Sequence, residues 1–399
     1  MSTLKVDAIK HNSATSDAIT TAADGTCTAR ITGMTGGGGL SHRNIIINGA
    51  MMVAQRSVSS SATSGYNVVD RIYSEYGGTD GSDGAITFSQ SDVASGTTPY
   101  NLGFRKAYKV LNGDQTSGAG AGDFVTGLLY KIEAQDLANS GWNYTSSSGY
   151  LTLSFWVKAS VAQNYFGELR TADGTSQSFI FETGSLTANT WTKVTKTIPG
   201  NSNLTFNNDN GLGMYIALYP FYGTTYTNNA NGLEVWEAAA GDHYSKDNTT
   251  TWWTTDNATF EVTGLQLEVG DTATSFEHRS FGEELSRCCR YFYRYKMDYG
   301  YGQYFSWMSY GGTDQRSQNI FFPTTMRTSP SMTYESTMGN YQNLGLGGTI
   351  SAFIMADSGS NEDSTGIRVT TQNSITSGSA GMVRGAGTTN GYFDFSAEL

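Results

Sequence analysis

The chain has 399 residues, 24 Lys and Arg against 35 Asp and Glu, a net charge of −11, and 48 Gly but only 5 Pro. Aromatic residues make up 13% and charged residues 15% of the chain, a combination that favours short strands joined by Gly, Asn and Ser turns over a helical bundle. The sequence contains no run of Lys or Arg and no apolar run of membrane-spanning length, so we expect neither nucleic-acid binding nor membrane insertion.

Cysteine and histidine usage limits the chemistry that the chain can perform. Cys27, Cys288 and Cys289 are an odd number without metal-ligand spacing, and the four histidines are scattered. We therefore expect no disulfide framework, no zinc motif and no cofactor, while the sequence leaves open whether another metal binds. The N-terminus lacks the charged start and apolar core of a signal peptide, which predicts a chain that starts in a cytoplasm.

Residues 1–40 differ from the rest of the chain. They are small and polar, and they end in the four glycines of 36–39, which form a flexible joint. Leu4, Val6 and Ile9 offer only a short apolar edge. Two interpretations stay open: a disordered tail, or an attachment segment that orders only against a partner protein.

Residues 41–279 read as repeated short strands. The β-branched run Ile45–Ile47 ends at Asn48-Gly49, which predicts a strand and a turn. Apolar residues alternate strictly in 151–157, which predicts a strand with one buried face. Further strands are expected at 85–89, 104–111, 123–134, 179–183, 214–221 and 260–270, the last with a bulge at Gly264. This spacing favours an all-β antiparallel sandwich or barrel.

A linking helix is predicted over 280–295. Ser280 and Glu283 have capping-box spacing. An apolar stripe follows at i, i+3, i+4 and i+7, formed by Leu285, Cys288, Cys289 and Phe292. The two cysteines are therefore expected to be core residues rather than redox groups.

Residues 296–399 are expected to form a smaller β-rich domain with long loops at the tip of the molecule. The segment 291–312 is very rich in Tyr, whereas 335–399 is rich in Gly, Ser, Thr and Asn with isolated apolar pairs. Pro323 and Pro330 restrict the strands between these segments to sheet edges or strand ends.

An ordered set of segments resembles jelly-roll modules of marine phage tail fibres. The matching segments are NIIINGAMMVAQR (44–56), VDR (69–71), YLTLSFWVKAS (150–160), TWTKVTKTIPG (190–200) and VTGLQLEVGDTATSFEHRSFGEELSRCCRYF (262–292). The start of the chain, over 1–26, also resembles structural proteins of cyanophages. The resemblance covers roughly residues 1–295. It implies a homotrimeric virion fibre whose jelly roll is similar to carbohydrate-binding modules, and it leaves open whether the fibre sits on tail or capsid.

An enzyme would need a catalytic constellation. Glu234, Glu237, Asp242 and His243 form the most acid- and His-dense stretch, around Trp236, but a solvated loop explains them better than a catalytic site does. The sequence contains no nucleophile elbow, phosphate loop or HExxH motif. We therefore expect no enzymatic activity, with a glycan-degrading tailspike as an alternative.

Sugar binding needs exposed aromatic rings beside short polar side chains. The candidate ligand-binding residues lie in one aromatic segment between 219 and 253: Tyr222, Tyr226, Trp236, Trp252 and Trp253. Trp252 and Trp253 are expected on opposite faces of a strand, so that one ring can be core and the other exposed. The alternative is that both cap the sandwich. The Tyr run at 291–312 is the rival site, although core or trimer contact explains it better.

The sequence therefore predicts a phage tail fibre protein, made in the host cytoplasm and located in the virion. Residues 1–40 would attach it to other virion proteins. Its outer part would bind a host-surface glycan, through the loop around Trp252 and Trp253 or through the C-terminal tip loops beyond residue 335. A non-binding structural adaptor or capsid decoration protein is the alternative of a different class.

Overall fold

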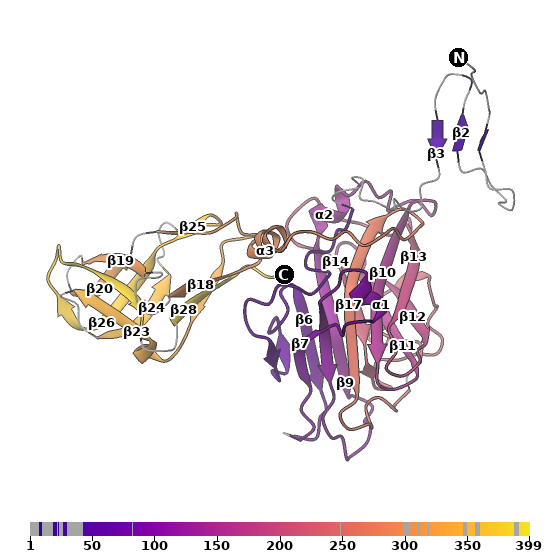
Figure 1. Cartoon of the computed structure of the whole chain (residues 1–399), viewed down its shortest axis with the longest axis horizontal. Helices are drawn as coiled ribbons and strands as arrows, with labels where there is room; N and C mark the ends of the chain where they lie inside the picture. Colours follow the sequence, from indigo (N-terminus) through magenta and orange to yellow (C-terminus); the bar gives the residue numbers. More distant parts are fainter. Residues whose placement is uncertain are drawn as a thin grey trace.

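A computed structural model shows two β-rich bodies joined at a short helix (Figure 1). It describes residues 8–9, 19–21, 23, 27–29, 43–81, 83–247, 249–297, 304–309, 312–317, 319–345, 349–355, 360–386 and 391–399. Within the described part of residues 1–40, three short strands pair antiparallel: β1 (Ala8–Ile9), β2 (Ile19–Thr21) and β3 (Cys27–Ala29). Leu4, Val6 and the glycine run at 36–39 lie outside the described residues.

The larger body is an antiparallel jelly-roll sandwich of two sheets, as the sequence predicts. The six-stranded sheet has the order β13-β10-β17-β8-β7-β4, and the facing sheet has the order β16-β12-β11-β14-β9-β6-β5, with β15 paired to β9. The strands are β4 (Ser59–Ser60), β5 (Ser64–Gly65), β6 (Ile72–Gly77), β7 (Thr87–Asp92), β8 (Lys106–Leu111), β9 (Phe124–Glu133), β10 (Tyr150–Ala159), β11 (Asn164–Thr171), β12 (Gln177–Ser185), β13 (Thr192–Pro199), β14 (Leu212–Tyr219), β15 (Phe221–Tyr222), β16 (Trp236–Ala238) and β17 (Thr259–Val269). Two short helices, α1 (Thr98–Asn101) and α2 (Ala134–Ala138), lie between strands.

The predicted bulge in β17 is present. Ser154 pairs with Gln266 and Trp156 pairs with Thr263, so two residues of β17 lie opposite the single Phe155. Gly264 has φ +66°, and a Cβ atom there would lie 2.7 Å from the ring of Phe104. Glycine therefore satisfies both the left-handed backbone and the close packing.

The predicted strand at Ile45–Ile47 is wrong. Within this segment only the Ile45 N–H bonds to a neighbouring strand, where it donates to the Leu267 carbonyl of β17 at 2.9 Å. The next N–H groups donate to side chains instead. The N–H of Ile47 donates to the Tyr130 hydroxyl at 2.8 Å, and that of Asn48 donates to Glu284 at 2.6 Å. Such bonds compete with a ladder and hold the segment as an irregular cover on the sandwich.

Helix α3 (Phe281–Cys289) links the two bodies. The backbone N–H of Glu283 donates to Ser280 Oγ at 3.2 Å, which confirms the predicted N-cap. Cys288 and Cys289 are both buried and free, as predicted. The helix ends before Phe292, which instead begins the first strand of the second body.

The described residues of the smaller body form three antiparallel sheets, ordered β18-β28-β22, β23-β27-β19-β20-β26-β24 and β21-β25. Its core is aromatic, with Phe393 at 4.9 Å from Phe353 and 5.6 Å from Phe305, measured between ring centroids. Its elements are β18 (Phe292–Met297), β19 (Tyr304–Ser309), β20 (Gly312–Ser317), β21 (Ile320–Phe321), β22 (Ser331–Tyr334), the 3-10 helix η1 (Met338–Asn340), β23 (Tyr341–Gly345), β24 (Ile350–Met355), β25 (Ser364–Thr365), β26 (Ile367–Ile375), β27 (Ala380–Gly385) and β28 (Gly391–Ser396).

Candidate functional site

Trp252 and Trp253 are core residues, and the prediction that they lie on a strand is wrong. Both lie in a turn, and both are 0% exposed. The ring of Trp253 stacks on Phe221 at 4.9 Å, and its Nε1 donates to the Gly118 carbonyl at 2.8 Å. The Trp252 Nε1 donates to the Thr259 carbonyl at 3.2 Å. Neither ring offers a free face to a sugar, because the pair fills the end of the sandwich core.

Trp236 is half-buried on β16, an edge strand. Its ring lies 5.3 Å from Phe179, and its Nε1 donates to the Pro199 carbonyl at 2.7 Å. Trp236 therefore closes one edge of the sandwich.

Tyr222 and Tyr226 do come together, with ring centroids 5.2 Å apart. Tyr244 stacks on Tyr222 at 5.2 Å with an interplanar angle of 14°. Tyr222 is buried. These rings pack against one another because residues 223–247 fold over the eight-stranded sheet, so the predicted cluster is largely covered.

A buried carboxylate lies beneath this covering segment. Glu168 accepts hydrogen bonds from Arg170, Ser178 and Tyr219, the last two at 2.7 Å. Burial raises the pKa of Glu168, whereas the neighbouring Arg170 acts in the opposite direction. The Arg170 guanidinium also lies over the ring of Tyr244 at 4.3 Å and donates to the His243 carbonyl at 2.7 Å. The carboxylate thus stabilises the covering segment through Arg170.

The acid-rich stretch around Trp236 is occupied by structural contacts. Glu234 pairs with Lys196, Glu237 accepts from the Gly232 N–H at 2.9 Å, and Asp242 accepts from Asn228 at 2.9 Å. Across the described residues, His, Cys, Asp and Glu side chains do not gather in threes as a metal site would need. The helices in the described part of the chain are too short or too polar to cross a membrane.

Two cavities flank helix α3 where the bodies meet, and no sequence pattern predicted either of them. The aromatic cavity, of about 490 Å³, is lined by residues that include Gln55, Phe281, Ser286, Tyr293, Lys296 and Pro323. The arginine cavity, of about 550 Å³, is lined by residues that include Arg43, Asp136, Ser286, Arg287, Arg290 and Thr324. Both volumes lie in the range of small-molecule sites, which often occur at domain junctions.

The aromatic cavity combines exposed and partly buried rings with polar groups. Phe281, at the first position of α3, is 56% exposed, and Tyr293 on β18 is half-buried. Burial raises the pKa of Tyr293 to about 12, so its hydroxyl stays a hydrogen-bond donor near neutral pH. Gln55 donates through Nε2 to Asp70 and to the Phe292 carbonyl, which fixes its amide at the cavity wall. The apolar ring faces and nearby polar atoms suit a sugar ring.

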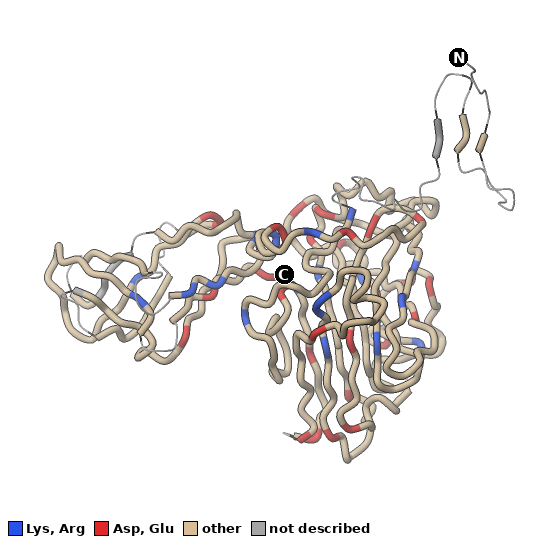
Figure 2. The backbone as a smooth tube through the Cα atoms, viewed as in Figure 1, with Lys and Arg blue, Asp and Glu red and all other residues tan. Residues whose placement is uncertain are grey.

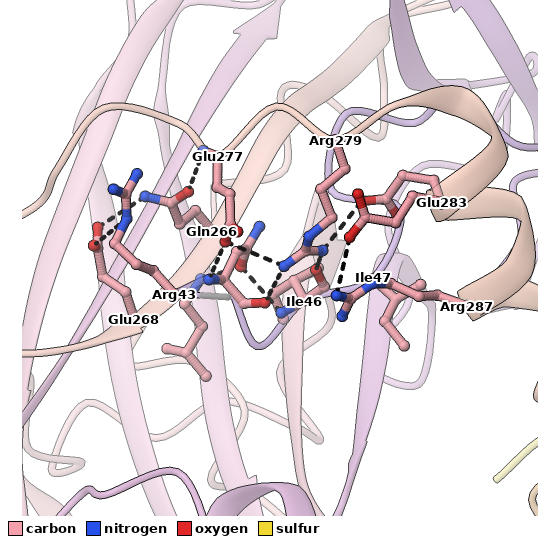
Figure 3. Close-up of polar contacts among 12 residues, drawn as sticks. Arg43, Ile46, Ile47, Gln266, Glu268, Glu277, Arg279, Glu283 and Arg287 are labelled. Carbon is pink, nitrogen blue, oxygen red and sulfur yellow. Dashed lines mark hydrogen bonds and ion pairs between the residues drawn. The ribbon is translucent and has the colours of Figure 1, made fainter. Parts of the chain in front are cut away.

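A network of ion pairs holds the wall of the arginine cavity (Figure 3). Arg279 pairs with Glu277 at 3.2 Å and with Glu284 at 3.1 Å, and it donates to the Ile46 carbonyl at 3.0 Å. Glu277 in turn accepts from the Asn44 backbone at 2.7 Å. The network ties the irregular segment at 43–48 to the start of α3. Figure 2 shows acidic and basic positions close together around this junction.

A second ion pair fixes the far end of the same wall. Arg290 binds Glu133 through two hydrogen bonds of 2.8 Å each. Burial alone would raise the pKa of Glu133, but hydrogen bonds from Arg290 and Tyr291 bring it below its ordinary value. Glu133 therefore stays ionised and holds the guanidinium in place.

Helical spacing did not point to this site. Phe281 lies four residues before Leu285 and seven before Cys288, which places it on the predicted apolar stripe, yet it is 56% exposed. The cavities themselves depend on contacts between segments more than 200 residues apart. Asn44 and Glu277, for example, are 233 positions apart in the sequence.

Comparisons with known proteins give only distant similarities. No protein-family model matches the chain. No curated protein matches it.

Solved structures include partial matches. The enzymatically active domain of tailspike protein 4 from Bacteriophage CBA120 matches with a TM-score of 0.30 and 11% identity, over 57% of this chain and 21% of that one. The chain thus spans about a fifth of the tailspike structure. The tandem CBM22 modules of Paenibacillus barcinonensis Xyn10C match with a TM-score of 0.23 and 9% identity, over 82% of this chain and 93% of that one.

Proposed function

We propose that this chain is a non-enzymatic virion appendage subunit of the tail-fibre kind that binds a cell-surface glycan. The observation that carries the proposal is the aromatic cavity, where the exposed Phe281 ring and the Tyr293 ring adjoin Gln55 and Lys296. Sugars bind through stacking of C–H faces on rings and hydrogen bonds to hydroxyls, and this cavity supplies both.

The cavity lies on a fixed support, as a binding site requires. Helix α3 is capped at Ser280, and Glu284 on its buried side pairs with Arg279 and accepts from the Asn48 N–H. Tyr293 is held from behind by Phe395, with ring centroids 6.4 Å apart. The rings are therefore positioned before a ligand arrives, which reduces the entropy lost on binding.

Replacing Phe281 with Ala tests the site. The variant should fold normally, because Phe281 is exposed, but it should lose binding to a glycan array and to intact bacterial cells. Tyr304→Ala is the matched control, since Tyr304 is 53% exposed on the smaller body away from the cavity. If Phe281→Ala and wild type bind the same glycans equally well, the aromatic cavity is not the site.

Attachment and assembly form the second part of the proposal. Residues 1–40 would attach the subunit to other virion proteins, and the subunit would be a homotrimer, which would offset weak single sites by presenting three of them. Deleting residues 1–40 should leave a folded protein that no longer enters particles.

Light scattering at micromolar concentration should give the mass of a trimer, and the mass of a monomer would contradict the proposed assembly.

A structural adaptor is the competing function. It would need the same rigid junction but no ligand. If the full chain binds no array glycan and no cells, while the form without residues 1–40 fails to enter particles, the adaptor function is supported instead.

A further inference from the structure

The two cavities adjoin along helix α3. Ser286 lines both of them, and the consecutive residues Pro323 and Thr324 line one each. Successive residues of a helix are rotated by about 100° around its axis. The side of α3 that lines the aromatic cavity, with Phe281, is therefore adjacent to the side that lines the arginine cavity, with Arg287. Ser286 lies between the two sides. One ligand could therefore contact both cavities at once, with a sugar ring in one and a substituent in the other.

The arginine cavity concentrates cations in a chain whose net charge is −11. Three guanidiniums line it, with side-chain exposures of 21% for Arg43, 30% for Arg287 and 31% for Arg290. Two of their carboxylate partners are more deeply buried than the guanidiniums, with Glu268 3% and Glu133 0% exposed. A ligand in the cavity would thus meet guanidinium edges before it meets these carboxylates.

Arg290 and Arg43 keep donors for a ligand. Arg290 uses Nε and Nη2 for Glu133, which leaves the Nη1 group on the other edge. Arg43 donates from Nη2 to the Ser275 carbonyl at 2.7 Å, and its buried Nε faces Glu268 at 3.8 Å, so Nη1 is the group left for a ligand. A planar guanidinium with free N–H groups is suited to a carboxylate or a sulfate.

We infer that the arginine cavity binds an anionic substituent, a carboxylate or a sulfate, of the glycan whose ring occupies the aromatic cavity. This inference rests on the proposed glycan-binding function and specifies its substrate class as an acidic saccharide. Asp136 is the one carboxylate among the cavity's lining residues, and it lies exposed on α2. It provides an acceptor for a sugar hydroxyl beside the bound anion.

Binding by the full chain to four probes tests the inference: inorganic sulfate, D-glucuronate, glucose 6-sulfate and D-glucose, each measured by calorimetry. Sulfate reports on the arginine cavity alone, glucose on the aromatic cavity alone, and the two charged sugars on both. The charged sugars should bind about tenfold tighter than glucose, and added salt should weaken them. A preference between glucuronate and glucose 6-sulfate identifies which anion the cavity selects.

Arg287→Gln is the test variant, because Arg287 is partly exposed and its pair with Glu283 lies on the helix surface. It should weaken sulfate and both charged sugars about tenfold and leave glucose unchanged. Arg105→Gln, at an exposed guanidinium that lies over Tyr100, is the matched control and should change nothing. Arg43→Gln is a second test variant, with the same expected losses.

The outcomes separate the two claims. If Phe281→Ala abolishes glucose binding but keeps sulfate binding, both cavities act as proposed. If sulfate binds and Arg287→Gln weakens it while no sugar binds, the anion site stands and the glycan proposal fails. If charged sugars bind no tighter than glucose, or if both Arg variants keep wild-type affinity for sulfate, the inference is overturned.

Discussion

Arg71 on the sandwich and Glu398 near the C-terminal end form an ion pair in which the side chains are only 1% and 6% exposed. The Arg71 guanidinium lies 3.4 Å from the ring centroid of Tyr291 and donates to the Lys131 carbonyl at 2.7 Å. Residues 397–399 thus return from the smaller body and pack against the sandwich beside α3, so the pair fastens the junction on which both cavities depend.

Glu398→Gln should destabilise the protein strongly. It removes the charge that compensates a fully buried guanidinium, and breaking one side of a buried ion pair costs about 3–5 kcal/mol. Urea unfolding followed by tryptophan fluorescence would measure the loss. Glu362→Gln, at an exposed carboxylate of the smaller body, is the control and should stay within about 0.5 kcal/mol of wild type. If Glu398→Gln unfolds at the same urea concentration as wild type, the Arg71–Glu398 pair does not fasten the junction.

Local sequence patterns predicted local structure well. The alternation of apolar residues predicted the strand at 150–159, Gly264 predicted the bulge, and Ser280 predicted the helix cap. Each of these features depends on neighbours within a few residues. The same reasoning failed at Ile45–Ile47, where the decisive partners are Tyr130 and Glu284.

The binding site was harder to predict, for the same reason. Trp252 and Trp253 belong to an aromatic segment that suits a ligand surface by composition, but composition does not say which ring faces the core. The Arg71–Glu398 pair spans 327 positions, and no periodicity reports such a contact.

Trp252→Ala and Trp253→Ala should each unfold the sandwich more easily without a specific effect on sugar binding. Both indoles are fully buried, so truncation leaves a cavity and costs about 3–5 kcal/mol. Thermal denaturation would show the loss, and any fall in glycan binding should follow the folded fraction. Trp236→Ala should cost less, because that ring is only partly buried. A stable Trp252 or Trp253 variant that loses binding would restore these residues as ligand contacts.

Cys288 and Cys289 should resist alkylation in the native protein. Burial raises the pKa of the Cys289 thiol to about 12 and raises that of Cys288 as well, so neither forms appreciable thiolate at pH 8. Iodoacetamide labelling at pH 8, followed by mass spectrometry of the peptide that contains both residues, should show modification only after unfolding in urea. Rapid labelling of the native chain would mean that α3 detaches from the core.

The folding stability should increase as pH falls from 7 to 5. Burial raises the pKa of Asp70 from 3.8 to about 6, although Arg56 and Gln55 act in the opposite direction. A carboxyl whose pKa is higher in the folded state stabilises that state when protonated. This contribution is complete below the unfolded pKa and is lost as pH rises through about 6.

For Asp70 alone, these values give about 1 kcal/mol between pH 7 and pH 5. Glu75, Asp136 and Glu168 also have raised pKa values through burial, so their contributions have the same sign. Glu133, whose pKa is lowered, acts in the opposite direction, but only at pH values near and below its ordinary pKa of 4.5.

Urea unfolding at pH 5, 6 and 7 would measure the trend. Asp70→Asn should flatten it, because an amide does not titrate, while Asp256→Asn, at a surface turn, should leave the slope unchanged. A wild-type stability that falls steadily from pH 7 to pH 5 would contradict the assignment of a raised pKa to Asp70.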